Sequence, residues 1–82
     1  MTLPKNKVFC FDIDGVIASI TLNAEYGTAK PIKENIKIIN KLFDNENKIV
    51  LFTARGSQTG IDWRETTENQ MKEWGVKHSE LK

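Results

Sequence analysis

The feature that most constrains this chain is an apolar run that ends in two acids. Residues 9–15 read FCFDIDG, so Asp12 and Asp14 stand one residue apart and a glycine follows them. An apolar run of this length is typical of a buried strand, and charges at its end are costly unless they have a role. In open α/β sheets, ligands bind beyond the carboxyl ends of the strands. The sequence therefore predicts a site for a metal ion, for catalysis or for both at this position.

Hydrophobic patterning predicts the elements that follow. Residues 7–11 form a first strand, which we expect to be buried on both faces of a sheet. The polar stretch 19–30 is interpreted as a surface loop or short flap, and Pro31 opens an amphipathic helix. Residues 48–52, which read KIVLF, form a second strand parallel to the first. The apolar positions of the helix are Ile32, Ile36, Ile38, Ile39, Leu42 and Phe43.

A second helix is predicted after the second strand. Asp62 is placed to cap its start, and Glu65 stands three residues later, which is the spacing of a capping box. Gly75 occupies the position of a helix C-cap glycine. Residues 76–82 could begin a third strand. With 82 residues, the chain has room for a single domain, 1–82.

The expected connection places two strand ends together. A strand, a helix and a parallel strand form a right-handed βαβ unit, which sets both carboxyl ends on one edge of the sheet. The residues after Phe52 should therefore face Asp12 and Asp14. We expect a three-layer, Rossmann-like α/β domain with a parallel sheet and no substantial cap.

The residues expected at this edge suit phosphate chemistry. A carboxylate can attack phosphorus to form an aspartyl phosphate, with Mg²⁺ offsetting the repulsion between two anions. A second acid can protonate the leaving oxygen and then take a proton from water. The Thr53 hydroxyl, backbone amides near Gly15, Ala54 and Arg55, and the Arg55 charge could hold the phosphate oxygens. Alternatively, the acidic pair alone could be a turn in which one acid caps the backbone.

Two segments resemble the signatures of a known superfamily. Residues 11–16, FDIDGV, look like the first signature of the haloacid dehalogenase (HAD) superfamily, mostly Mg²⁺-dependent phosphatases. Residues 51–56, LFTARG, look like its second signature, a strand that ends in Thr or Ser. The longer stretch 53–77 is similar to small capless members that act as capsule biosynthesis phosphatases and related sugar-phosphate phosphatases.

The resemblance implies roles for individual residues. It makes Asp12 the nucleophile and a Mg²⁺ ligand. It makes Asp14 the general acid and base, with its backbone carbonyl on the metal, and Thr53 a phosphate ligand. Arg55 and Gly56 lie within the second signature, but their roles vary across the superfamily. The implied reaction is phosphomonoester hydrolysis, and the implied partner is a small phosphorylated sugar or related metabolite in polysaccharide biosynthesis.

The chain also departs from the superfamily pattern. A third signature, a lysine, and a fourth, an acidic pair, would follow the point where residue 82 stands. We expect the chain to be the front part of a longer protein. The alternative is a catalytically incomplete HAD-like protein that binds phosphate, a metal or a partner.

Composition excludes several other classes. Twelve Lys and Arg against eleven Asp and Glu give a formal charge of +1, so no basic footprint for nucleic acid is present. No segment is apolar enough for a signal peptide or a membrane span, and we expect a cytoplasmic protein without a membrane partner. Cys10 is the only cysteine, which rules out an internal disulfide, and its place in an apolar strand predicts a buried, inert thiol.

Overall fold

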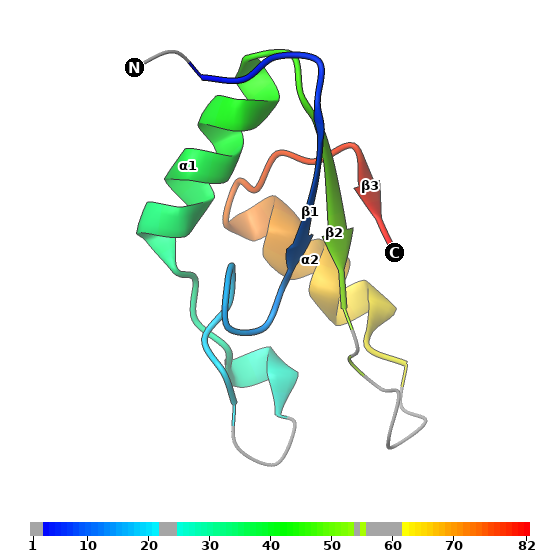
Figure 1. Ribbon diagram of the computed structural model, residues 1–82. Coiled ribbons are helices and arrows are strands. Elements are labelled where there is room, and N and C mark those ends of the chain that lie inside the picture. The colour runs from blue at the N-terminus through cyan, green and yellow to red at the C-terminus, as the bar shows by residue number, and fades with distance from the viewer. Residues whose placement is uncertain (1–2, 22–24, 54, 56–61) are drawn as a thin grey trace.

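The computed structural model describes residues 3–21, 25–53, 55 and 62–82 (Figure 1). Its elements, in chain order, are β1 (Val8–Asp12), η2 (Tyr26–Thr28), α1 (Lys33–Asp44), β2 (Lys48–Phe52), α2 (Arg64–Glu73) and β3 (Glu80–Leu81). The predicted order of strands and helices is confirmed, and η2 is a single 3₁₀ turn inside the predicted surface loop. Ala54, a predicted phosphate-binding residue, and Gly56 of the second signature lie outside the described part.

The three strands form one parallel sheet in the order β1-β2-β3. The predicted parallel pairing of the first two strands is confirmed, and its register joins Val8 to Lys48 and Asp12 to Phe52. The second strand has the predicted bounds, whereas the first begins and ends one residue later than predicted. The expected third strand is present as the two residues of β3.

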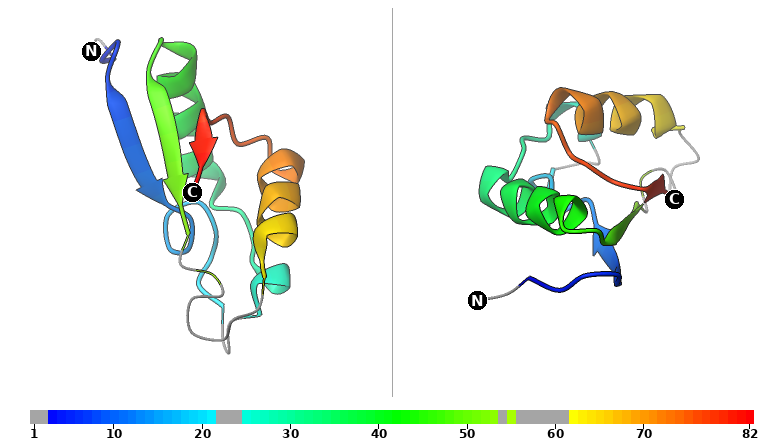
Figure 2. Two further views of the ribbon diagram at one scale, coloured as in Figure 1. Left: turned by 90° about the vertical axis from the view of Figure 1, so that its right-hand side faces the viewer. Right: turned by 90° about the horizontal axis from the view of Figure 1, so that it is seen from above.

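Both helices lie on the same face of the sheet (Figure 2). The strand order equals the sequence order, so the two right-handed crossovers move across the sheet in one direction and leave their helices on one side. The described residues therefore form two layers, and the predicted third layer is not among them. The α/β class and the parallel sheet are confirmed at this coarser level.

The second face of β1 is open to solvent. Val8 is 63% exposed and Cys10 is also exposed, whereas the alternate residues Phe9 and Phe11 pack against the core. The predictions that this strand is buried on both faces and that Cys10 is buried were wrong. Alternate residues of a strand point to opposite faces, and here only one face is covered by helices.

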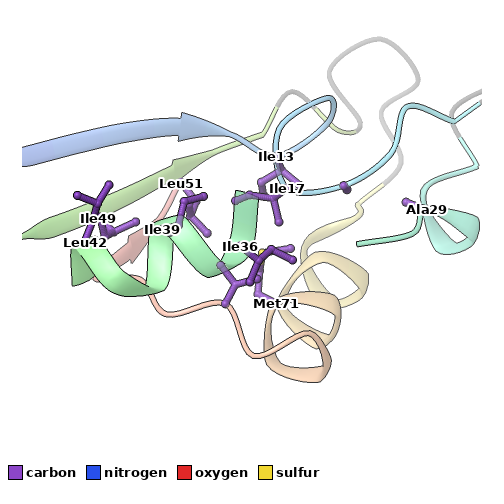
Figure 3. Packing of buried hydrophobic residues seen from close by; sticks show 11 residues of the cluster. Ile13, Ile17, Ala29, Ile36, Ile39, Leu42, Ile49, Leu51 and Met71 are labelled. Carbon is purple, nitrogen blue, oxygen red and sulfur yellow. The ribbon is translucent and has the colours of Figure 1, made fainter. Parts of the chain in front are cut away.

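The core lies between the sheet and the helices (Figure 3). Its buried apolar side chains are Ile13, Ile17, Ala18, Ala29, Ile36, Ile39, Leu42, Ile49, Leu51, Met71 and Val76. The predicted apolar stripe of α1 is confirmed at its centre but is narrower than expected, because Ile38 is 56% exposed. Positions spaced by three point to the core, and Ile38 lies one residue off that row.

The C-terminal end of α2 follows the predicted chemistry, whereas the predicted capping box of Asp62 and Glu65 is not formed, because the N-cap residue is Trp63 and makes no side-chain capping bond. The Asp62 carboxylate accepts a hydrogen bond from the Arg64 N–H at 2.9 Å, although the helix itself begins at Arg64. Gly75 has φ of +67°, and the Val76 N–H donates to the Met71 carbonyl at 2.9 Å. This is the Schellman arrangement that ends helices on glycine. None of the described helices combines the length and apolar character that a membrane span requires.

Candidate functional site

The candidate site lies where β1 and β2 end side by side (Figure 1). Asp12 is the last residue of β1 and pairs with Phe52, the last residue of β2. The Ile13 N–H continues the ladder by donating to the Phe52 carbonyl at 3.1 Å. The residues that follow the two strands, Ile13 and Thr53, are therefore neighbours, which places Thr53 beside the acidic pair.

The acidic pair is anchored by a tight turn that is inserted into the core. Ile13 is 0% exposed, and its carbonyl accepts hydrogen bonds from three successive amides, Val16 to Ala18, at 2.8–3.3 Å. Asp12, in contrast, is exposed, and the Asp14 side chain is 27% exposed. The turn thus holds both acids on either side of the buried Ile13 at the end of β1.

Three predicted site residues line one hollow. Asp12, Asp14 and Thr53, together with Ile13 and Phe52, line a pocket of about 230 Å³. The predicted convergence of the two acids and the hydroxyl is therefore present in the structure. The contacts of Asp14 restrict the roles that these residues can have.

Arg55 is a buried centre of polar contacts. Its side chain is 0% exposed, and its Nη2 donates to Asp14 Oδ1 at 2.9 Å while Nε lies 3.2 Å from both carboxylate oxygens. Nη1 donates to Gln70 Oε1 at 2.6 Å and to Thr67 Oγ1 at 3.2 Å. The guanidinium also lies over the Tyr26 ring, 4.8 Å from its centroid. With every face occupied, this side chain offers no exposed surface to a ligand.

The partners of Arg55 are the site residues that sequence reasoning missed. Thr67 and Gln70 were not among the predicted site residues. They are buried polar side chains of α2, and Gln70 Nε2 donates to the Tyr26 carbonyl at 2.7 Å. Polar residues in the apolar row of an amphipathic helix signal a buried partner, since such groups are almost always paired.

Two predicted phosphate-binding amides are already engaged. The Gly15 N–H donates to the Ala18 carbonyl at 2.7 Å, and the Arg55 N–H donates to Thr53 Oγ1 at 3.0 Å. Gly15 has φ of +89°, which is the reason for glycine at this turn. No described residue accepts a hydrogen bond from the Asp14 N–H. Thr53 Oγ1 acts as an acceptor toward Arg55, and no described residue accepts a hydrogen bond from its O–H.

The pocket at the strand ends is lined by two acids that could act as Mg²⁺ ligands. Among the described residues, no group of three or more His, Cys, Asp or Glu side chains could hold a metal ion. The pocket offers the exposed Asp12 carboxylate and the Asp14 oxygens, and these are the hard oxygen donors that Mg²⁺ prefers. Mg²⁺ sites commonly use one or two carboxylates, with substrate phosphate and water completing the shell. The residues present fit such a partial site.

Comparisons of the chain with protein-family models, with curated proteins and with solved structures found no match. The resemblance of residues 11–16, 51–56 and 53–77 to HAD phosphatases therefore stays a prediction from the sequence.

Proposed function

We propose that this protein hydrolyses phosphate monoesters through an aspartyl-phosphate intermediate on Asp12. The observation that carries the proposal is the shared pocket: an exposed carboxylate, a second carboxyl group and a hydroxyl from two neighbouring strand ends meet in about 230 Å³. Such a volume suits a phosphate group with a small leaving group, and a phosphorylated sugar or related metabolite is the substrate class.

The reaction divides into two steps with named proton positions. An Asp12 oxygen forms a bond to phosphorus while the bond from phosphorus to the leaving oxygen breaks, and Asp14 gives that oxygen a proton. Water then attacks phosphorus, Asp14 takes its proton, and inorganic phosphate leaves with Asp12 restored. The Thr53 hydroxyl and the Asp14 N–H donate to the non-bridging oxygens.

Arg55 acts in this scheme through Asp14. Its contacts at 2.9 and 3.2 Å hold the Asp14 side chain in one orientation at the wall of the pocket. Mg²⁺, bound by the Asp12 carboxylate and the Asp14 backbone carbonyl, would supply charge neutralisation for the attack of one anion on another. The proposal thus reassigns Arg55 from phosphate ligand to positioning residue.

Hydrolysis of p-nitrophenyl phosphate tests the assignment. We expect slow turnover with Mg²⁺, its loss on chelation with EDTA, and a fall of at least about a hundredfold in Asp12→Asn. Glu34→Gln is the matched control, because Glu34 is an exposed acid of α1 that does not line the pocket. Undiminished turnover in Asp12→Asn would overturn the role of Asp12 as nucleophile.

A trapping experiment tests the intermediate directly. Acyl phosphates are cleaved by hydroxylamine, whereas phosphate esters of Thr or Ser are not. Brief reaction with a radiolabelled phosphate donor should therefore leave a hydroxylamine-labile label on the peptide that contains Asp12. A hydroxylamine-stable label would instead indicate attack by a hydroxyl group.

A second candidate function is phosphate binding without turnover. It is favoured by the engagement of Asp14 with the buried Arg55, which competes with proton transfer by the same carboxyl group. In that case, titration with inorganic phosphate and Mg²⁺ should shift the amide resonances of Asp14 and Thr53 while p-nitrophenyl phosphate stays intact. Turnover that depends on Asp12 would exclude this candidate.

A further inference from the structure

A second hollow lies away from the candidate site, between α1 and the C-terminal end of α2. This inter-helix groove has a volume of about 520 Å³, and its lining includes Lys33, Lys37 and Lys41 of α1, Ile36 below them, and Glu73 and Trp74 of α2. It shares no lining residue with the pocket at the strand ends. It lies on the helical side of the molecule, where α1 and α2 can be seen together in Figure 2.

One wall of the groove carries positive charge that nothing described in the structure neutralises. Lys33, Lys37 and Lys41 are exposed, and none of them forms an ion pair with a described residue. Asp44, at the end of the same wall, is paired with Lys77 at 2.8 Å. The lysine wall therefore presents three charges to whatever occupies the groove.

The floor of the groove is apolar and its two walls are tied together. Ile36 is 6% exposed, and Trp74 is half-buried against the core. Asn40 joins the walls, because its Nδ2 donates to the Gly75 carbonyl at 2.8 Å and its Oδ1 accepts from the Lys77 N–H at 2.8 Å. Because these two hydrogen bonds fix the walls, binding of a partner costs little conformational entropy in the groove.

The spacing of the charges selects the kind of partner. Four residues of helix advance about 6 Å, so the three lysines span about 12 Å along α1. A single phosphate is too short to use all three, whereas a second helix with an acid at every fourth residue has the same repeat. Glu73 lines the opposite wall, and its negative charge repels a ligand that is also negative on the side facing α2. A ligand that fits the groove therefore carries negative charge on the side that faces the lysines and apolar surface next to it.

We propose that the inter-helix groove binds an acidic amphipathic helix of a partner protein. Its acids pair with Lys33, Lys37 and Lys41, and its apolar residues contact Ile36 and Trp74. The proposal does not depend on the phosphatase activity, because the two hollows are separate.

The test uses a synthetic helical peptide as the probe. The peptide has about 16 residues, just above the length below which isolated helices are marginal, with Glu at every fourth position and Leu in the adjacent row. A twin peptide carries Lys in place of each Glu. Binding is followed by the fluorescence of Trp74 in a Trp63→Phe background, where it is the remaining tryptophan, and by amide shifts. We expect saturable binding of the acidic peptide that weakens as salt is raised, with shifts centred on the lysine wall.

Two triple variants separate the groove from net charge. Lys33→Glu, Lys37→Glu and Lys41→Glu together should weaken binding at least about tenfold. The control changes three exposed lysines outside the groove, Lys5, Lys7 and Lys72, to Glu, with the same change in net charge, and should alter affinity less than about twofold. Both variants alter exposed side chains, and circular dichroism checks that each is folded.

Three results would each overturn the proposal: equal binding of the Lys twin, equal losses in the two triple variants, or no saturable signal with the acidic peptide. Binding of a single-stranded oligonucleotide, in place of the peptide, at the same lysines would reassign the groove to nucleic acid and overturn it too.

Discussion

At the scale of single residues, Arg55 is the side chain on which most contacts converge. It joins the strand end at Asp14, the helix α2 and the segment around Tyr26, with its own side chain fully buried. A buried guanidinium is tolerated only when its donors are satisfied, and here each nitrogen has a partner. The same contacts keep the Asp14 carboxylate from turning away from the pocket.

Removing this guanidinium should therefore destabilise the fold. We expect Arg55→Met to lower the free energy of unfolding by about 2–3 kcal/mol, less than for a wholly buried pair because Asp14 is 27% exposed. Urea denaturation measures the change. Arg64→Met is the control, since its pair with Glu68 is about half exposed on both sides and should contribute no more than about 1 kcal/mol. Equal losses in the two variants would contradict a structural role for Arg55.

At the scale of elements, the end of α2 decides how the chain returns to the sheet. The Gly75 turn ends the helix, directs Val76 into the core and leads to β3. Asn40 of α1 donates to the Gly75 carbonyl and accepts a hydrogen bond from the Lys77 N–H, so the end of α2 is tied to the α1 wall of the inter-helix groove.

Two glycines allow the backbone requirement to be isolated. A Cβ added at Gly75 or at Gly27 meets nothing within 4 Å, but only Gly75 has a positive φ, +67°. Gly75→Ala should lower the free energy of unfolding by about 1 kcal/mol, the strain of a left-handed residue, as measured by thermal denaturation. Gly27→Ala should leave it unchanged or raise it slightly, because the unfolded chain loses freedom. A loss at Gly27 as large as at Gly75 would show that space, and not φ, matters.

At the scale of the whole molecule, the fold is one-sided. Both helices cover one face of the sheet (Figure 2). On the opposite face of β1, Val8 and Cys10 are exposed to solvent. A chain of 82 residues whose sheet is buried on one face has marginal stability, because small domains bury a smaller share of their surface than large ones.

The exposure of Cys10 gives a direct measure of this arrangement. Ellman's reagent should label one thiol per chain under native conditions, to the same extent as in denaturant and within minutes, because an exposed thiol needs no unfolding to react. Cys10→Ser should show no labelling and a free energy of unfolding within about 0.5 kcal/mol of the parent. A thiol that reacts only in denaturant would show that the open face of β1 is covered in solution.

Local patterns in the sequence predicted the elements because these depend on neighbouring residues. KIVLF predicted β2 with its observed bounds, Gly75 predicted the end of α2, and the acidic pair predicted a strand end. The sequence also predicted that Asp12, Asp14 and Thr53 lie together. Two strands joined by a right-handed crossover are parallel, so both end at the same edge of the sheet.

Contacts between distant residues were decided only by the tertiary structure. Whether β1 is covered on one face or two depends on where α2 crosses, so Cys10 was expected to be buried and is exposed. Arg55 follows Thr53 in sequence and was expected to face the ligand, yet its side chain turns inward because Gln70, Thr67 and Asp14 together satisfy it there. Sequence spacing determines which backbone positions are adjacent, whereas the direction of a long side chain is determined by partners that only folding brings within reach.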